Sequence, residues 1–232
     1  MASKTGLLAL VKAHDAQGVE DALSQTPQLL GHRDERGRNW LHVCCGVEIT
    51  GNRDAASSIE LARSLIGLGL DPNAHAFTEG EWRATPLWYA IGRGRNLPLA
   101  DWLLDQGVDP NYCLYAAAFG HDLPAIRLLI SHGADVDDLS AGNSPFLDAV
   151  SVSHFDAAEE LLKHGADVNR LHKSGLTALH LMLKKGTEPQ HLAMLARYGA
   201  RGDIPDPTGQ TAADILRRKR DADYRHIADQ LA

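Results

Sequence analysis

The sequence predicts an all-α fold, a solenoid of stacked helix–turn–helix units, and three observations predict it. A Gly-x-Asp-x-Asn/Asp element recurs as GLDPN, GVDPN, GADVD and GADVN, with a divergent GARGD, and begins at Gly69, Gly107, Gly133, Gly165 and Gly199. An apolar run with helical periodicity precedes each glycine, as in AAEELLKHG before the fourth element. A second set of short helical runs begins at Ser or Thr, as in TPLWYA at 85–90 and SPFLDA at 144–149.

The residue types within one unit explain why it folds as two helices and why the units must stack. Ser or Thr before Pro places a side-chain oxygen at the helix N-terminus, where it accepts from unpaired backbone N–H groups, and Pro is tolerated in the first turn. The glycine after the second helix supplies the left-handed conformation that ends it, and the Asp and Asn that follow favour a turn. Neither helix can bury its apolar face alone, so each unit requires neighbours.

This pattern resembles the ankyrin repeat, which has a period of about 33 residues and a T-P-L-H-x-A signature. The closest matches are TALH at 177–180 and HGADVN at 164–169, and the resemblance extends over nearly the whole chain. It implies an ankyrin-repeat solenoid whose units are joined by short β-hairpin fingers. The fingers and inner helices would form a concave face that usually binds another protein, and the fold would bring no catalytic machinery of its own.

In chain order, residues 1–232 are expected to form a single ankyrin-repeat domain. GLLALVKAHD and GVEDALSQTPQLL form a degenerate N-terminal repeat at 1–33. The full repeats are placed at 34–75, 76–111, 112–138, 139–171 and 172–205. A polar C-terminal capping repeat occupies 206–232, which includes TAADILRRKRDADYRHIADQLA.

Three departures from regularity lie in the first three full repeats. In the first full repeat an insertion, EITGNRDAA at Glu48–Ala56, lengthens the connection between its two helices. In the second full repeat the finger NAHAFTEGEWRATP is about four residues too long. The third full repeat has almost no finger, because GVDPN runs directly into YCLYAAA. A long finger beside a missing one is expected to leave a notch, and long loops in a regular array are where function concentrates.

Aromatic residues gather around this predicted notch: Trp82, Trp88, Tyr89, Trp102, Tyr112, Tyr115 and Phe119. Trp88, Tyr89 and Trp102 lie at inward-facing positions and are expected to pack in the core. Trp82 lies among Glu, Gly and Arg in the long finger, so it is predicted to be exposed and available for contact.

Other chemistries have weaker support. His42, Cys44 and Cys45 could be soft-metal ligands, but they occupy signature positions that favour packing, and no metal or other cofactor is predicted. The basic RRKR at 217–220 is attributed to a solvated face, and the formal net charge of −7 argues against nucleic-acid binding. Three cysteines, an odd number, indicate a reducing cytoplasm, and no stretch approaches the roughly 20 apolar residues of a membrane span.

Two functions are compared. The first is a non-enzymatic protein–protein interaction scaffold, an adaptor, inhibitor or immunity-type protein whose partner is another protein. The alternative is a receptor for a peptide or small ligand held in the aromatic notch around the second and third full repeats. A closed cage of aromatic rings would favour the receptor, and an open concave face with scattered charges would favour the scaffold.

The ankyrin pattern places exposed binding positions on the fingers and on the last turn of each inner helix. Carried over residue by residue, the predicted binding residues are Glu35, Arg36, Arg38, Glu81, Trp82, Arg93, Phe119, Ser140, Asn143, Ser151, Lys173, Lys184 and Lys185. Binding energy is expected to concentrate in the first three full repeats, where the departures lie.

Overall fold

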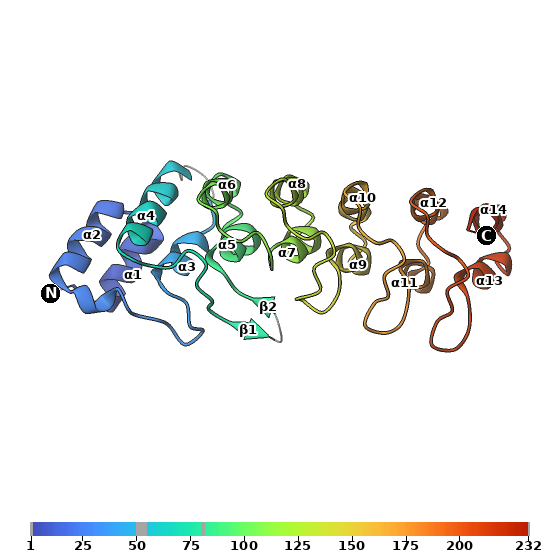
Figure 1. Ribbon diagram of the computed structural model, residues 1–232, viewed down its shortest axis with the longest axis horizontal. Helices are drawn as coiled ribbons and strands as arrows, with labels where there is room; N and C mark the ends of the chain where they lie inside the picture. Colours follow the sequence, from blue (N-terminus) through green and yellow to red (C-terminus); the bar gives the residue numbers. More distant parts are fainter. Residues whose placement is uncertain (1, 50–54, 80–81, 232) are drawn as a thin grey trace.

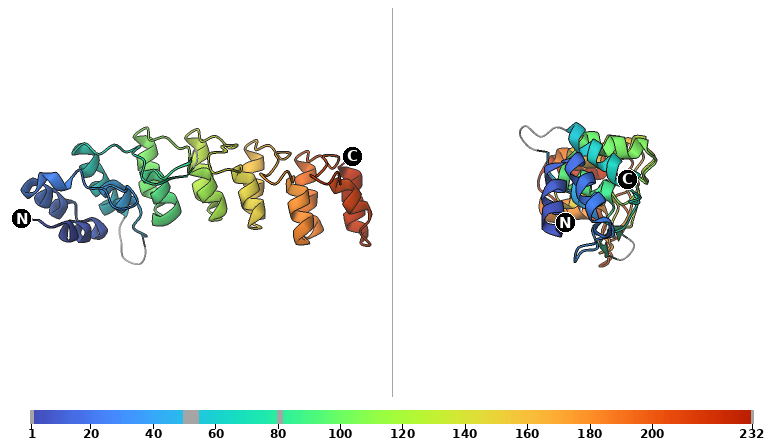
Figure 2. Two further views of the ribbon diagram at one scale, coloured as in Figure 1. Left: turned by 90° about the horizontal axis from the view of Figure 1, so that it is seen from below. Right: turned by 90° about the vertical axis from the view of Figure 1, so that its left-hand side faces the viewer.

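A computed structural model describes residues 2–49, 55–79 and 82–231, and it confirms an all-α solenoid. Pairs of helices follow one another along one long axis, and the two termini lie at opposite ends of the stack (Figure 1). Seen along that axis, the repeats superimpose closely (Figure 2). In Figure 1 one row of helices lies next to the loops at the bottom of the picture, and a second row lies above it, farther from the loops.

The helices alternate between these two rows. The inner row consists of α1 (Lys4–Ala13), α3 (Trp40–Cys45), α5 (Pro86–Tyr89) with the π-helical turn η2 (Ala90–Gly94), α7 (Leu114–Phe119), α9 (Pro145–Ser151), α11 (Ala178–Lys185) and α13 (Ala212–Arg217). The outer row consists of α2 (Ala16–Gln25), α4 (Ala55–Gly67), α6 (Leu97–Asp105), α8 (Leu123–Ser131), α10 (Phe155–Lys163), α12 (Pro189–Arg197) and α14 (Ala222–Gln230). A 3₁₀ turn, η1 (Pro27–Leu29), follows α2. Each of the seven residue ranges expected as a repeat contains one inner and one outer helix.

The loops that join successive repeats are the fingers. Within the described part of the chain, paired strands occur in the second finger alone, as β1 (Thr78–Glu79) and β2 (Trp82–Arg83), which run antiparallel with Glu79 opposite Trp82. The last finger has a single bridge between Pro205 and Thr211. Before α7 the chain has almost no finger, and Tyr112 adopts the left-handed conformation with φ 67°. We call the fingers together with the inner helices the finger face.

Helix starts have the capping chemistry that the sequence predicts. The side-chain oxygens of Thr85, Ser144, Thr177 and Thr211 accept hydrogen bonds from backbone N–H groups three residues later. In the first full repeat Asn39 takes this role, and its own N–H donates to Nδ1 of His42. The inner helices therefore begin at residues fixed by local hydrogen bonds.

The recurring Gly-x-Asp-x-Asn/Asp element forms a ladder of hydrogen bonds between repeats. Within the element the Asp side chain accepts from the N–H two residues later, as Asp109 does from Asn111 at 2.9 Å. The last residue of the element then accepts from the backbone N–H at the third position of the next one. These bonds are Asn73 to Asp109 (3.0 Å), Asn111 to Asp135 (3.3 Å), Asp137 to Asp167 (3.2 Å) and Asn169 to Arg201 (2.7 Å). This ladder is the physical reason for the repeated motif.

Apolar side chains of both rows form one continuous core between the helices. Leu161 and Leu162 of α10 are buried, as are the thiols of Cys44, Cys45 and Cys113, which are all free. Burial raises the pKa of the Cys113 thiol, which keeps it protonated. The burial of Cys44 and Cys45 agrees with their predicted packing role.

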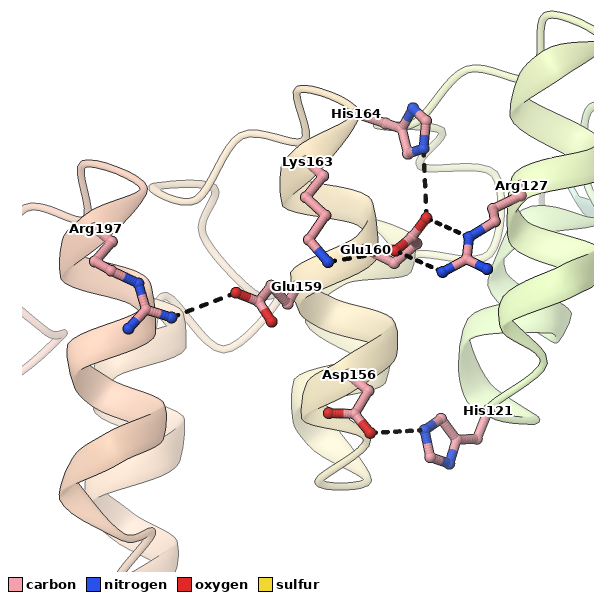
Figure 3. A network of polar contacts seen from close by, with 8 residues as sticks. All are labelled: His121, Arg127, Asp156, Glu159, Glu160, Lys163, His164 and Arg197. Carbon is pink, nitrogen blue, oxygen red and sulfur yellow. Dashed lines mark hydrogen bonds and ion pairs between the residues drawn. The ribbon is translucent and has the colours of Figure 1, made fainter.

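The outer helices are linked by charged groups on their exposed side (Figure 3). Glu160 of α10 is nearly buried, and its carboxylate accepts from Arg127 of α8 at 2.6 Å and 3.2 Å. Lys163 and His164 lie 3.6 Å from the same carboxylate. The hydrogen bonds from Arg127 outweigh desolvation and lower the pKa of Glu160. The network connects two repeats on the side opposite the fingers.

The predicted insertion Glu48–Ala56 lies between α3 and α4. Its residues 50–54 are outside the described part of the chain. At its start, the N–H of Ile49 donates to the carbonyl of Gly94 at 3.1 Å, so the insertion begins against the next repeat. No helix within the described residues is long and apolar enough to cross a membrane.

Candidate functional site

A large hollow opens on the finger face at the N-terminal end of the stack. Its volume is about 980 Å³, and it lies between α1, α3, the first finger and the second finger. We call it the N-terminal hollow. Its lining residues are Lys4, Leu8, Lys12, His32, Asp34, Glu35, Arg36, Arg38, Trp40, Val43, Gly46, Val47, Phe77, Trp82, Ala84, Trp88, Tyr89 and Arg93.

The first finger is held in shape by Asp34. Its carboxylate accepts from the backbone N–H groups of Arg36 and Arg38, each at 2.9 Å, and from Nε of Arg38 at 2.7 Å. Burial acts to raise the pKa of Asp34, but these hydrogen bonds and the charge of Arg38 outweigh it and lower the pKa. Gly37 has φ 74°, and a Cβ there would lie 3.1 Å from the carbonyl oxygen of Ala76, so the two fingers lie in contact. The backbone that carries Arg36 is therefore ordered.

The floor of the hollow is aromatic. The rings of Trp82 and Trp88 are 5.2 Å apart at 74°, and those of Trp88 and Tyr89 are 5.0 Å apart at 89°, both edge-to-face arrangements. Phe77 lies 5.9 Å from Trp82 and is 47% exposed, so it presents an apolar surface at the rim. Within the described residues Nε1 of Trp88 has no hydrogen-bond partner.

The rim of the hollow is cationic. Five cationic residues line it, Lys4, Lys12, Arg36, Arg38 and Arg93, against two acidic ones, Asp34 and Glu35. Among the described residues, Arg38 is the only one of the five cations with an ion pair, and its partner is Asp34 at 2.7 Å. The whole chain has a formal net charge of −7, so the hollow is a local positive region on an acidic protein.

The structure brings five of the sequence-predicted binding residues together in this hollow: Glu35, Arg36, Arg38, Trp82 and Arg93. Phe119, at the end of α7, is 57% exposed, and Lys173, Lys184 and Lys185 are exposed further along the finger face. Ser140 and Ser151 are half-buried, and Glu81 lies outside the described residues. Phe119, Ser140, Ser151 and the three lysines do not line the hollow.

The predicted exposure of Trp82 is wrong. Its side chain is only 9% exposed, its Nε1 donates to the carbonyl oxygen of Tyr112 at 3.2 Å, and its ring packs edge-on against Tyr115. The side chain turns inward because the missing third finger leaves space that an indole fills. Trp82 therefore closes the predicted aromatic notch, and the open cavity lies on the other side of the second finger.

The predicted exposure of Asn143 is also wrong. Asn143 is buried, its Oδ1 accepts from the backbone N–H of Lys173 at 3.2 Å, and its Nδ2 donates to Asp148 at 3.3 Å. Both ends of this side chain are hydrogen-bonded inside the protein, and the bond to Lys173 links two neighbouring fingers.

Sequence reasoning missed the contribution of the N-terminal helix. Lys4, Leu8 and Lys12 of α1 line the hollow together with Val43 and Val47 of the first full repeat. The signal in the sequence is the spacing of four between these three residues, which places them on one side of a helix. Because these three residues lie far from Arg93 in the sequence, the pattern of single repeats did not show that all four line the same hollow.

One group of side chains outside the hollow has the composition of a metal site. Asp101 and Asp105 of α6 and His132 after α8 place one ligand atom each within 4.8 Å of one another. His132 Nε2 lies 3.6 Å from the Asp101 carboxylate, and both acidic residues are exposed. A surface contact between the two helices accounts for this arrangement, so it gives no reason to infer a bound metal.

Comparisons with known proteins agree with the fold. Residues 87–172 match the family model for ankyrin repeats, in three copies. The chain is 35% identical over 98 residues to the B-cell lymphoma 3 protein homolog of Mus musculus, and this match covers 41% of this chain and 22% of that protein. The chain is 39% identical over 88 residues to inversin of Gallus gallus, and this match covers 37% of this chain and 8% of inversin. The chain thus spans less than a quarter of the length of these relatives.

Two solved structures have a similar fold over nearly the whole chain. The human ASB11 ankyrin repeat domain gives a TM-score of 0.72 at 17% identity, covering 97% of this chain and 96% of that one. The ankyrin repeat domain of Bcl-3, described as a member of the IkappaB protein family, gives a TM-score of 0.74 at 22% identity, covering 100% and 99%. At these identities the similarity establishes the architecture alone.

Proposed function

Because this chain is an ankyrin-repeat protein, and ankyrin repeats are generally protein–protein interaction modules, we propose that it is a non-enzymatic scaffold that binds a partner protein through its finger face. The N-terminal hollow is the centre of that contact. An adaptor, an inhibitor and an immunity-type protein would all act in this way. The three free cysteines support a cytoplasmic location, where thiols stay reduced.

The observation that carries the proposal is the composition of the hollow. Aromatic and arginine side chains are enriched at the energetic centres of protein interfaces, and this hollow places Arg36, Arg93 and a half-buried Trp88 around one space. Its volume of about 980 Å³ exceeds what one side chain fills. A partner segment that entered it would meet charge at the rim and apolar surface beneath.

The receptor alternative is less well supported at the place where the sequence suggested it. Trp82 packs edge-on against both Trp88 and Tyr115, so these rings fill the predicted notch instead of forming a closed cage around it. The open hollow has scattered charges around an apolar floor, which is the arrangement expected of the scaffold.

The test begins with identification of a partner, by cross-linking in native extract. Binding of that partner is then measured by calorimetry against two matched double variants. Arg36→Glu with Arg93→Glu alters the hollow, and Arg63→Glu with Arg197→Glu alters exposed positions on the outer helices. Loss of binding in the first pair alone supports the proposal. Loss in the second pair alone would place the interface on the outer helices and refute it.

A further inference from the structure

We propose that the N-terminal hollow takes an extended acidic segment of the partner protein, with one bulky apolar side chain packed against the apolar residues that line the hollow beneath its cationic rim. This inference rests on the proposed function and specifies the chemistry of the partner. The hollow supplies two independent constraints on an occupant, one electrostatic and one apolar.

The electrostatic constraint comes from cations on three separate elements. Lys4 and Lys12 lie on α1, Arg36 lies on the first finger, and Arg93 lies on the π-helical turn η2. Lys4, Lys12, Arg36 and Arg93 are all exposed. Cations held close together repel one another, and a partner with carboxylates relieves that repulsion. The acidic remainder of the chain repels such a partner elsewhere, so the segment would be directed to this one region.

The apolar constraint comes from the walls beneath the rim. Leu8, Val43 and Val47 line the hollow beside the half-buried ring of Trp88 and the exposed ring of Phe77. An acidic polymer without apolar groups would satisfy the cations and leave this surface in contact with water. A leucine or aromatic side chain of the partner would cover it and remove its apolar area from water, which favours binding.

The geometry favours an extended segment over a helix. The hollow is bounded on one side by two fingers that touch, as the approach of Gly37 to the carbonyl of Ala76 shows, and on the other by the short helices α1 and α3, so it contains no long groove between helices. Its volume of about 980 Å³ is at the upper end of the range of ligand pockets, which suits a few residues of chain.

The experiment uses a displayed library of random peptides of about twelve residues, selected on the full chain. Enriched peptides are synthesised with a fluorescent label, and their affinity is measured by anisotropy at low and high salt. The hollow variant is Lys12→Glu, Arg36→Glu, Arg93→Glu. The matched control is Arg197→Glu, Arg218→Glu, Arg220→Glu, which makes the same change in net charge with exposed residues at the other end of the molecule, none of them among the predicted binding residues. Melting curves verify that both variants fold.

We expect enrichment of Asp and Glu around a Leu, Phe or Trp. The peptides should bind the hollow variant at least about tenfold more weakly and the control within about twofold, and high salt should weaken binding to the wild type. Phe77→Ala should weaken peptides with the apolar residue and leave their alanine-substituted forms unchanged. Neutral or basic enriched peptides, or equal affinity for both charge variants, would overturn the proposal.

Two further outcomes separate this inference from the proposed function. A natural partner that binds the finger face but is insensitive to the hollow variant would refute the inference and leave the scaffold function standing. An RNA oligonucleotide that binds the hollow more tightly than the acidic peptides would refute it in favour of nucleic acid. Enriched peptides and partners that all remain bound when the hollow variant is combined with Lys173→Glu and Lys184→Glu would refute the finger face itself as the binding surface.

Discussion

The side-chain carbonyl oxygen of Asn169 accepts a hydrogen bond from the backbone N–H of Arg201 at 2.7 Å, and its Nδ2 donates to the carbonyl of Gly199 at 3.1 Å. One asparagine thus pairs with two backbone groups of the following repeat. Asn73, Asn111 and Asp137 link the earlier repeats by the same kind of bond, in which the side-chain oxygen accepts from a backbone N–H of the next repeat. Among the residues that the structure describes, the bond from the side chain to a glycine carbonyl is made by Asn169 and not by these three residues.

Removal of this link should destabilise the junction it spans. Asn169→Ala leaves the N–H of Arg201 and the carbonyl of Gly199 without their partner, and we expect a loss of about 1–2 kcal/mol in the free energy of unfolding, measured by urea denaturation. Asn169→Asp is the matched control, because it keeps the acceptor for Arg201 and loses only the donor to Gly199. An aspartate variant as unstable as the alanine variant would show that the Arg201 bond contributes little.

The burial of Trp82 makes a second prediction. Trp82→Ala removes a large ring from the space beside Tyr112 and Tyr115, so it should lower the free energy of unfolding by about 3–5 kcal/mol. Trp82→Phe keeps a ring but loses the hydrogen bond to Tyr112, and should cost about 1 kcal/mol for that bond in addition to the lost packing. Phe77→Ala, at the exposed rim of the same finger, should change stability by less than about 1 kcal/mol. A Trp82→Ala protein as stable as the wild type would contradict the packing.

The contrast between Asn169 and Trp82 shows what sequence reasoning could and could not predict. The Gly-x-Asp-x-Asn/Asp element repeats because the same local contact is made at each junction, so the pattern alone predicts the stack. Trp82 has no counterpart in other repeats. Its position depends on space left by a missing finger about 30 residues later, and that space exists only after the repeats stack.

The residues of the N-terminal hollow likewise fall into those that the sequence could predict and those that it could not. Arg36, Arg38 and Arg93 could be predicted because the ankyrin pattern assigns finger and inner-helix positions one repeat at a time. Lys4 and Lys12 could not, because the first repeat is degenerate and no signature residue marks which side of α1 faces the fingers. The hollow is a property of three neighbouring repeats together.

His42 predicts a dependence of stability on pH. It is fully buried, and its Nε2 lies 3.0 Å from the carbonyl of Ala74 and 3.2 Å from that of Ala84, so it joins both ends of the second finger. Burial lowers the pKa of His42 to about 4, and although the two carbonyls act to raise it, the charges of Arg33 and Arg38 lower it further. The folded state therefore binds this proton less readily than the unfolded chain does.

A folded-state pKa below the ordinary value of 6.5 means that the contribution of His42 is present above pH 6.5 and is lost as the pH falls towards 4. We expect the wild type to lose about 1–2 kcal/mol between pH 7 and pH 5 through this residue. His42→Gln should be less stable at pH 7, and that difference should shrink at pH 5. A His42→Gln protein with the wild-type profile would contradict the assignment.

Asp148 predicts the opposite dependence. Burial raises the pKa of Asp148 to about 6, although the hydrogen bond from Asn143 and the charge of Lys173 act to lower it. The folded state therefore holds a proton that the unfolded chain has released, so ionisation of Asp148 destabilises the protein as the pH rises from about 4 to above 6. Asp148→Asn should be more stable than the wild type by about 1 kcal/mol at pH 7.5, after allowance for the partial exposure of the carboxylate. The two proteins should be equally stable at pH 4, and a constant difference across this range would contradict the prediction.

The last prediction concerns how repeats share stability. Leu162 of α10 is 5% exposed, and α10 packs against both its own inner helix α9 and the preceding outer helix α8. Leu162→Ala should lower the free energy of unfolding by about 2–5 kcal/mol, because it removes buried methyl groups and leaves a cavity.

Each repeat is stabilised by its neighbours, so the loss of stability caused by Leu162→Ala should extend beyond α10. Hydrogen exchange monitored by mass spectrometry should therefore show faster exchange in α8 and α12 as well as in α10. Leu171→Ala makes the same chemical change at a leucine that is 51% exposed, and should leave exchange in all three helices at the wild-type rate. Faster exchange confined to α10 would show that this repeat unfolds independently, which contradicts a stack held together by its interfaces.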